Sequence, residues 1–125
     1  MEPEFHQSND EAVLVDLIQS ARTEADAPII NPAAYSFTSI AMYDAMKVFE
    51  GPIFEVHISN IHARDELHRH SKLSSAVTAV IADLGPFVVV GPAYLFKVMR
   101  EHCSRDRLNR VTTGTWLRES ANNQS

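Results

Sequence analysis

The residues of this sequence best suited to chemistry lie between positions 55 and 71, which read EVHISNIHARDELHRHS. Glu55, His57 and Ser59 occupy alternate positions of a predicted strand, and they share one face because side chains in a strand alternate between its two faces. A glutamate beside a histidine fixes the tautomer of the imidazole and stabilises its cation, which a general acid requires. The segment therefore predicts a proton-transfer site.

The elements expected to position these residues alternate between helices and strands. Hydrophobic periodicity and turn signals predict helices at 9–22, 39–49 and 92–102, a short polar helix at 63–70, and strands at 28–31, 53–58 and 78–82. The spacing of residues 73–84 also fits a helix, but short length and flanking turns favour a strand. Ser8 and Glu11 predict a capping box at the first helix. This alternation predicts an α/β fold with a largely parallel sheet.

Polar residues end two of the expected strands. Asn31 ends the strand at 28–31, and the group of Glu55, His57 and Ser59 ends the strand at 53–58. In open α/β sheets, ligands bind beyond the carboxyl ends of the strands, so both sets of polar groups are expected to converge at one edge. We therefore expect the active site at this edge.

Composition limits the classes of function. The chain has 125 residues and 45% hydrophobic content, which suits one domain with one core. Its formal charge is −5 and its lysines and arginines form no long runs, so no nucleic acid partner is expected. Cys103 is the only cysteine, which excludes a disulfide framework and a thiolate metal cluster and fits a reducing, cytoplasmic setting.

The two ends of the sequence give further expectations. The first residues have neither the basic start nor the apolar stretch of a signal peptide. The most apolar region, residues 77–99, is interrupted by charged, proline and glycine residues, so no membrane span is expected. From about residue 104 the chain is polar. We expect an α/β domain at 1–103 and a mobile or partner-docked polar tail at 104–125.

Several short motifs together resemble the type II 3-dehydroquinate dehydratase family. They are QSN at 7–9, INPAAY at 30–35, TS at 38–39, DA at 44–45, EVHISNIHAR at 55–64 and HS at 70–71. The resemblance implies a flavodoxin-like three-layer sandwich, assembled as trimers or a dodecamer. It also implies the elimination of water from 3-dehydroquinate to give 3-dehydroshikimate, in the shikimate pathway or in quinate catabolism. No metal and no organic cofactor are implied.

The resemblance also implies a role for each matched residue. His57 would be the general acid that protonates the leaving hydroxyl, and Glu55 would orient it. Asn31 would hydrogen-bond substrate oxygens. The backbone N–H of Ile58 and the hydroxyl of Ser59 would hold the substrate carboxylate.

A further implied residue, Asp44, would reach a substrate hydroxyl in a neighbouring subunit. Its position gives this role independent support, because Asp44 lies one helical turn from both Ile40 and Val48. Such a partly apolar helix face suits an interface between subunits.

The sequence also departs from the family pattern. Family members begin with an Asn-Leu-Asn-Leu-Leu-Gly strand and a lid that bears an essential arginine and a tyrosine base. Residues 2–4, Glu-Pro-Glu, faintly echo the lid, but no arginine precedes them and no tyrosine follows. We therefore expect an N-terminally truncated fold, in which the strand ending near His6 pairs elsewhere or is lost. In the pocket, Phe37 replaces a histidine and His68 replaces an arginine, so His68 would be a titratable substrate contact. Residues 91–92, Gly-Pro, interrupt a helix that is continuous in the family.

Plainer interpretations of the same residues stay open. His57 also fits a hydrogen-bonded structural histidine, Asp44 a helix-surface acid and Asn31 a turn former. Residues 64–66 also fit a solvated face with a local ion pair. Histidines 57, 62, 68 and 70 suggest a metal site, but their spacing matches no standard zinc pattern, so no metal is expected.

Two functions from different classes follow. The first is a dehydratase that uses His57 as its acid on a small-molecule substrate. The second is a non-catalytic relative, a binding or oligomeric scaffold protein, because the arginine and tyrosine of the lid have no counterpart in the sequence.

Overall fold

Three parallel strands form the centre of the computed structural model, which describes residues 2–102 and 115–118. These three strands are β2 (Ile29–Ile30), β3 (Phe54–His57) and β4 (Ala79–Ala82). Two further strands, β1 (Glu2–Phe5) and β5 (Thr115–Arg118), form a separate sheet. The α-helices are α1 (Glu11–Glu24), α2 (Ile40–Lys47) and α3 (Val90–His102). Short 3-10 turns are η1 (Ala33–Phe37), η2 (Ile61–Ala63), η3 (Glu66–His68), η4 (Ser74–Ala76) and η5 (Gly85–Val89).

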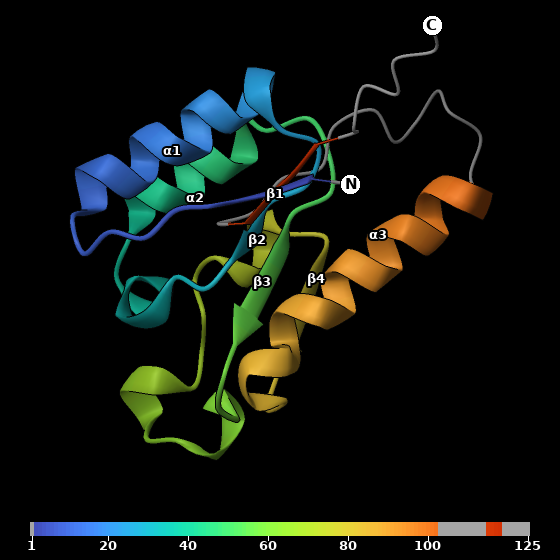
Figure 1. Ribbon diagram of the computed structural model, residues 1–125. Helices are drawn as coiled ribbons and strands as arrows, with labels where there is room; N and C mark the ends of the chain where they lie inside the picture. Colours follow the sequence, from blue (N-terminus) through green and yellow to red (C-terminus); the bar gives the residue numbers. More distant parts are fainter. Residues whose placement is uncertain (1, 103–114, 119–125) are drawn as a thin grey trace, which may run out of the picture.

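Helices cover both faces of the parallel sheet, whose strand order is β2-β3-β4. In Figure 1, α1 and α2 lie on one side of the strands and α3 lies on the other. The alternation of side chains explains the two layers. Ile30 and Ile53 belong to the core cluster beneath α1 and α2, whereas Ile29, Phe54 and Val56 belong to the cluster that includes Val88 of η5. The predicted α/β fold with a parallel sheet is confirmed.

The first two helices are joined through their N-terminal caps. Asp10, rather than the expected Ser8, caps α1, and its carboxylate accepts the N–H of Ala12 at 2.8 Å. Glu11 does not complete the predicted capping box; its carboxylate accepts a hydrogen bond from the hydroxyl of Ser39. Ser39 itself caps α2 and accepts the N–H of Met42 at 3.0 Å. One serine therefore both starts α2 and ties it to α1.

The prediction of a short polar helix at 63–70 was wrong. Two separate 3-10 turns, η2 and η3, take its place, and Arg64 between them is extended, with ψ −177°. The reason is local: the side chain of Asp65 accepts the N–H groups of Leu67 and His68 at 3.0 and 3.2 Å, which starts a new turn instead of continuing a helix. His70 lies beyond both turns.

The ambiguous segment at 78–82 forms a strand, as predicted. β4 pairs with β3 in parallel, with Glu55 opposite Val80 and His57 opposite Ala82. The proline at 92 lies in the first turn of α3, where its missing N–H has no intrahelical partner to lose. Gly91 and Pro92 therefore do not break this helix.

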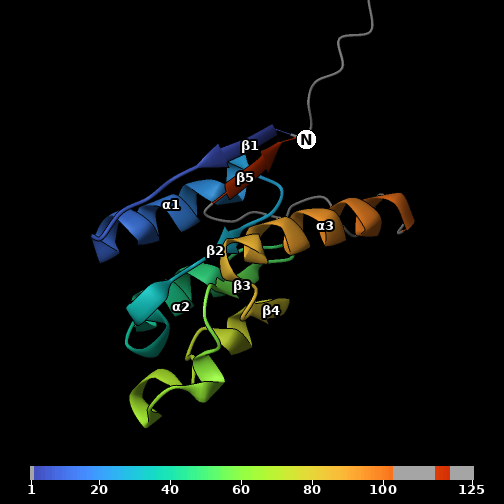
Figure 2. The same ribbon diagram turned by 60° about the horizontal axis from the view of Figure 1, so that its bottom comes forward.

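Strand β1 stands apart from the parallel sheet and pairs with β5. The two are antiparallel, with Glu2 opposite Arg118 and Phe5 opposite Thr115, so the strand near His6 does pair elsewhere, as expected. Figures 1 and 2 both show the two strands side by side, and β5 also lies near β2. Strand β5 falls inside the polar tail predicted at 104–125. The rest of that tail, residues 104–114 and 119–125, lies outside the described part, and so does Cys103. The domain boundary stays a prediction.

No helix of the described residues is both long and apolar enough to pass through a membrane.

Candidate active site

A buried carboxylate organises the end of β3. Glu55 is fully buried and His57 is 4% exposed. The Nε2 of His57 lies 2.7 Å from Oε1 of Glu55. Two hydroxyls complete the set, because Ser71 donates to Oε1 at 2.6 Å and Ser74 donates to Oε2 at 2.8 Å. The predicted pairing of Glu55 with His57 on one face of a strand is confirmed.

The charge state of Glu55 follows from these contacts. Burial by itself raises the pKa of a carboxyl group, but the hydrogen bonds from His57, Ser71 and Ser74 outweigh it. The pKa of Glu55 therefore lies below its ordinary value of 4.5. An ionised Glu55 holds the imidazole of His57 in place through Nε2, and Nδ1 of the ring makes no hydrogen bond within the described residues.

The sheet opens where β2 and β3 end. Pro32 has no N–H, so the hydrogen-bond ladder between the two strands cannot extend past Asn31. Within the described residues, the N–H of Ile58 at the end of β3 donates no hydrogen bond. The side-chain oxygen of Asn31 accepts the N–H of Ala33 at 3.2 Å, which makes a turn beside the opening. Asn31 is therefore a turn former whose amide nitrogen remains available to a ligand.

The opening forms a hollow of about 170 Å³. Its lining is made of residues that follow β2 and β3, namely Asn31, Ala33, Phe37, His57, Ile58, Ser59, Ile61 and Arg64. Four of the predicted site residues, Asn31, His57, Ile58 and Ser59, therefore line one hollow at the carboxyl ends of parallel strands. Glu55 lies behind His57 and reaches the hollow through it.

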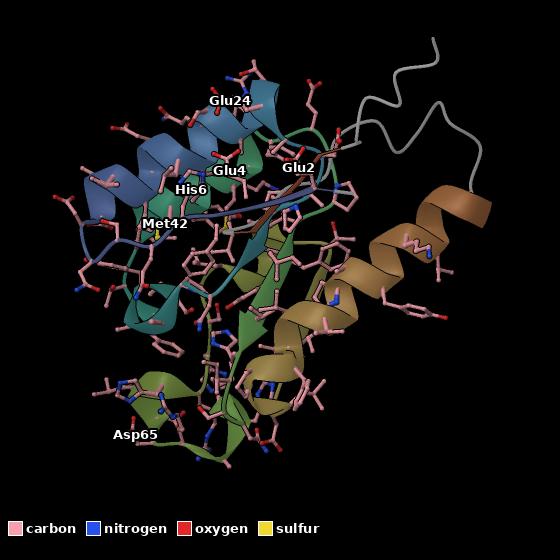
Figure 3. All side chains as sticks on the ribbon, in the orientation of Figure 1. Glu2, Glu4, His6, Glu24, Met42 and Asp65 are labelled. Atoms are coloured by element: carbon pink, nitrogen blue, oxygen red, sulfur yellow. The ribbon has the colours of Figure 1, made fainter. Side chains whose placement is uncertain are left out.

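Two other predicted site residues do not line the hollow. Asp44 is exposed on α2. His68 is half-buried, with Nδ1 2.8 Å from Oδ1 of Asp65, and its ring makes a T-shaped contact with the ring of Phe37, with centroids 5.3 Å apart. His68 thus contacts the lining through Phe37. Figure 3 shows Asp65 at the outer edge of the molecule, far from α1 and α2.

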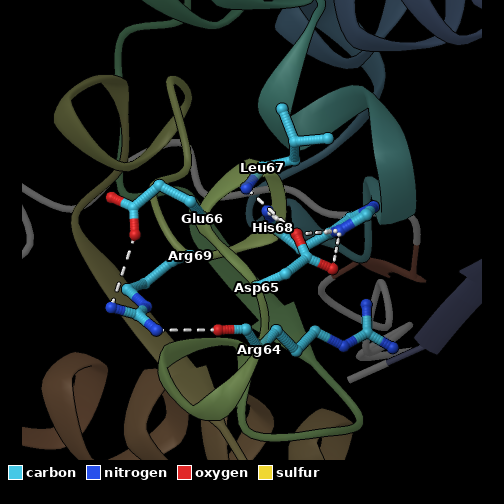
Figure 4. A network of polar contacts seen from close by, with 6 residues as sticks. All are labelled: Arg64, Asp65, Glu66, Leu67, His68 and Arg69. Carbon is cyan, nitrogen blue, oxygen red and sulfur yellow. Dashed lines mark hydrogen bonds and ion pairs between the residues drawn. The ribbon is translucent and has the colours of Figure 1, made fainter.

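Arg64 is a candidate that the sequence interpretation missed, because it was grouped with Asp65 and Glu66 as a solvated face. Those two acids do make local ion pairs, but with His68, Arg69 and His70. Arg64 lines the hollow, and its guanidinium makes no ion pair with the neighbouring residues drawn in Figure 4. Its place at the end of the matched EVHISNIHAR motif was the signal that could have identified it.

The histidines of this region do not gather around a metal. Among the described residues, no three or more histidine, cysteine, aspartate or glutamate side chains are arranged to hold a metal ion. His62 is exposed, and His70 lies 3.4 Å from the carboxylate of Glu66.

Together, the fold and the site define an α/β protein with a Glu–His pair at the carboxyl ends of a parallel sheet. The family model described as Dehydroquinase class II matches residues 1–90. The chain belongs to this family, which confirms the resemblance seen in the sequence.

Curated relatives are about half identical to this chain. A 3-dehydroquinate dehydratase of Wolinella succinogenes is 55% identical over 87 residues, which are 70% of this chain and 52% of the relative. The 3-dehydroquinate dehydratase 1 of Agrobacterium fabrum is 47% identical over 94 residues, 75% of this chain and 65% of the relative. A catabolic 3-dehydroquinase of Verticillium alfalfae is 49% identical over 84 residues, 67% of this chain and 56% of the relative. The chain thus spans about half to two thirds of their length.

Solved structures of type II dehydroquinases have the same fold. The enzyme from Propionibacterium acnes gives a TM-score of 0.67 at 38% identity and covers 74% of this chain and 64% of its own. The enzyme from Butyrivibrio crossotus gives a TM-score of 0.70 at 31% identity, with 74% and 65% covered. The flavodoxin-like arrangement of a parallel sheet between helices is therefore confirmed.

Removing one donor to Glu55 should destabilise the protein. We expect Ser74→Ala to lower the free energy of unfolding by about 1–3 kcal/mol, because Oε2 of the buried carboxylate loses its hydrogen bond. Ser75→Ala, at an exposed neighbour, should change it by less than about 0.5 kcal/mol. Urea unfolding followed by circular dichroism measures both values. Equal values for the two variants would contradict the role given to Ser74.

The lowered pKa of Glu55 also predicts how stability depends on pH. A group whose pKa is lower in the folded state stabilises the protein fully above its unfolded pKa, here about 4.5, and this contribution is lost as the pH falls towards the folded pKa. We therefore expect the free energy of unfolding to decline below about pH 4.5. Glu55→Gln should flatten this decline, whereas Glu50→Gln, at an exposed position, should leave it unchanged. An unchanged slope in Glu55→Gln would contradict the assignment.

Proposed function

We propose that the hollow binds 3-dehydroquinate and that His57 supplies the acid half of its dehydration. One observation carries this proposal: the buried Glu55 holds His57 at 2.7 Å, behind a hollow that is also lined by Asn31, Ile58 and Ser59. An acid, an amide, an unpaired N–H and a hydroxyl are the groups that a cyclic hydroxy acid requires. The names of the curated relatives support the same reaction.

The proposed chemistry assigns one task to each group. The protonated His57 donates its Nδ1 proton to the leaving hydroxyl as the C–O bond breaks, and Glu55 stabilises the imidazolium before the transfer. The N–H of Ile58 and the hydroxyl of Ser59 bind the ring carboxylate, and the guanidinium of Arg64 adds positive charge beside them. Asn31 hydrogen-bonds a ring hydroxyl through its amide nitrogen.

The base half of the reaction has no candidate in the lining. A base must remove the proton next to the ketone so that the ring double bond can form, and no tyrosine is among the described residues that line the hollow. The hydroxyl of Tyr35 donates to the carbonyl of Asn9 at 2.7 Å instead. We propose that the base reaches the hollow from a segment outside the described residues or from another subunit.

The biological setting stays a proposal as well. The relatives are named both as 3-dehydroquinate dehydratases and as a catabolic 3-dehydroquinase, so either the shikimate pathway or quinate catabolism fits a lyase with this site. A cytoplasmic location fits the single cysteine of the sequence.

A homo-oligomer, trimer or dodecamer, is proposed from the surface of α2. Ile40 is 57% exposed and Val48 is 51% exposed, one turn on either side of the exposed Asp44. An apolar face with a carboxylate at its centre suits an interface from which Asp44 reaches the hollow of a neighbouring copy.

The second candidate function is a binding protein without catalysis. Two observations favour it: the lining offers no base within the described residues, and Phe37 contributes a ring that cannot hydrogen-bond to a hydroxyl. Isothermal titration with quinate, shikimate and 3-dehydroquinate tests it. Tight binding without turnover supports this candidate, whereas turnover of 3-dehydroquinate removes it.

Turnover of 3-dehydroquinate by the wild type and by His57→Ala tests the dehydratase proposal. The protein should convert 3-dehydroquinate to a conjugated enone, observed by ultraviolet absorbance, and His57→Ala should lower the rate by roughly a hundred- to ten-thousand-fold because the leaving hydroxyl then departs without an acid. His62→Ala removes an exposed histidine outside the hollow and should leave the rate unchanged. A wild-type rate equal to that of buffer would rule out the proposal for this chain.

Asp44 gives a test of the oligomer. We expect light scattering to show an assembly of three or more copies, and Asp44→Asn to lower turnover while the mass of the assembly stays the same. Asp16→Asn, at an exposed position on α1, is the control. A monomeric protein that retains turnover would contradict the role proposed for Asp44.

A further inference from the structure

The residues that line the hollow are of two chemical kinds. The polar ones are Asn31, His57, Ser59 and Arg64, whose side chains carry an amide, an imidazole, a hydroxyl and a guanidinium. The apolar ones include Ala33, Phe37 and Ile61, and Phe37 is the only aromatic carbon ring among the described lining residues. A ligand in the hollow therefore meets hydrogen-bonding groups and also apolar surface that offers no hydrogen bond.

The phenyl ring of Phe37 is positioned by a contact with the imidazole ring of His68. The ring of His68 meets Phe37 at an interplanar angle of 83°, with centroids 5.3 Å apart. His68 is itself fixed by Asp65, whose Oδ1 and Oδ2 lie 2.8 and 2.9 Å from Nδ1 of the imidazole. Asp65 in turn accepts the N–H of Leu67 at 3.0 Å and is part of the backbone turn η3. This chain of contacts makes Phe37 a wall with a set position.

A fixed phenyl wall favours some rings over others. A hydroxyl that faces Phe37 gives up its hydrogen bonds to water and gains none, because a phenyl ring has no donor or acceptor to offer. The face of a planar, unsaturated ring carries no hydroxyl, so it loses no hydrogen bond against Phe37 and gains an aromatic contact. The carboxylate of either ring still has Ser59 and Arg64 available in the same lining.

We propose that Phe37, positioned by His68 and Asp65, makes the hollow select planar, unsaturated ring carboxylates over saturated polyhydroxy ring acids. The inference rests on the proposed function, because it concerns the ligand of the same hollow. Phe37 is the specificity-determining residue, and His68 and Asp65 are positioning residues that act through it.

Three ring carboxylates of increasing planarity test the selection by isothermal titration. Quinate has a saturated ring, shikimate has one double bond and 3,4-dihydroxybenzoate is fully planar. We expect affinity to rise in that order, with about three- to tenfold between the first and the last. Equal affinities, the reverse order, or no binding of any of the three would overturn the proposal.

Substitution of the wall should change the order of affinities. Phe37→His gives the wall a hydrogen-bonding group and should remove or reverse the preference, and Phe37→Leu should keep the discrimination against quinate but lose the aromatic gain. Phe5→His, at a phenylalanine that is 74% exposed on β1, should leave the series unchanged. Circular dichroism and unfolding midpoints establish that each variant is folded. A preference that persists in Phe37→His would contradict the role of the ring.

Variants of His68 separate positioning from general stability. His68→Phe keeps a ring against Phe37 and should retain the preference, whereas His68→Ala removes that ring and should reduce it. Two variants that lose the preference equally, at equal stability, would count against the contact of the two rings.

Failure of this inference is distinguishable from failure of the proposed function. Turnover of 3-dehydroquinate together with equal affinities keeps the dehydratase and overturns the selection. The ordered series of affinities without turnover keeps the selection and overturns the dehydratase.

Discussion

The buried carboxylate of Glu55 is the constraint on which the site depends. A carboxylate without solvent must be hydrogen-bonded, and its donors come from His57 on its own strand and from Ser71 and Ser74 in the segment that follows. That segment therefore cannot move away from β3 without leaving the charge unsatisfied. The same requirement that holds the imidazole at the hollow also anchors the segment between β3 and β4, which carries Arg64 between two 3-10 turns and His68 within the second.

The hollow itself results from the end of a hydrogen-bond ladder. Parallel strands stay paired only while each can donate, and Pro32 stops the pairing of β2 with β3 just beyond Asn31. The strands separate at this point and leave the N–H of Ile58 free among the described residues. The fixed imidazole of His57 therefore lies beside an unpaired backbone N–H, and this pairing of a rigid side chain with free backbone is what a ligand site requires.

Local patterns in the sequence predicted the features that depend on neighbouring residues. Alternation along β3 predicted the shared face of Glu55 and His57, and the punctuated apolar runs predicted the parallel sheet. The helix predicted at 63–70 was wrong because hydrophobic periodicity does not register side chains that bind the backbone. The side chain of Asp65 competes for backbone N–H groups and divides the expected helix into two turns. Contacts across the fold, such as Phe37 with His68 or Ser74 with Glu55, leave no periodic trace in the sequence, so these pairs could not be predicted from it.

The antiparallel pairing of β1 with β5 bears on the order in which the chain folds. Glu2 and Arg118 meet across almost the whole printed sequence, so closing this ribbon costs the entropy of the largest loop in the molecule. During synthesis, β1 leaves the ribosome long before β5, so the two cannot pair until β5 follows, while α1, α2 and the parallel sheet can already pack. The ribbon is therefore a late event in folding, and until it forms β1 exposes an unpaired strand edge that other chains can bind.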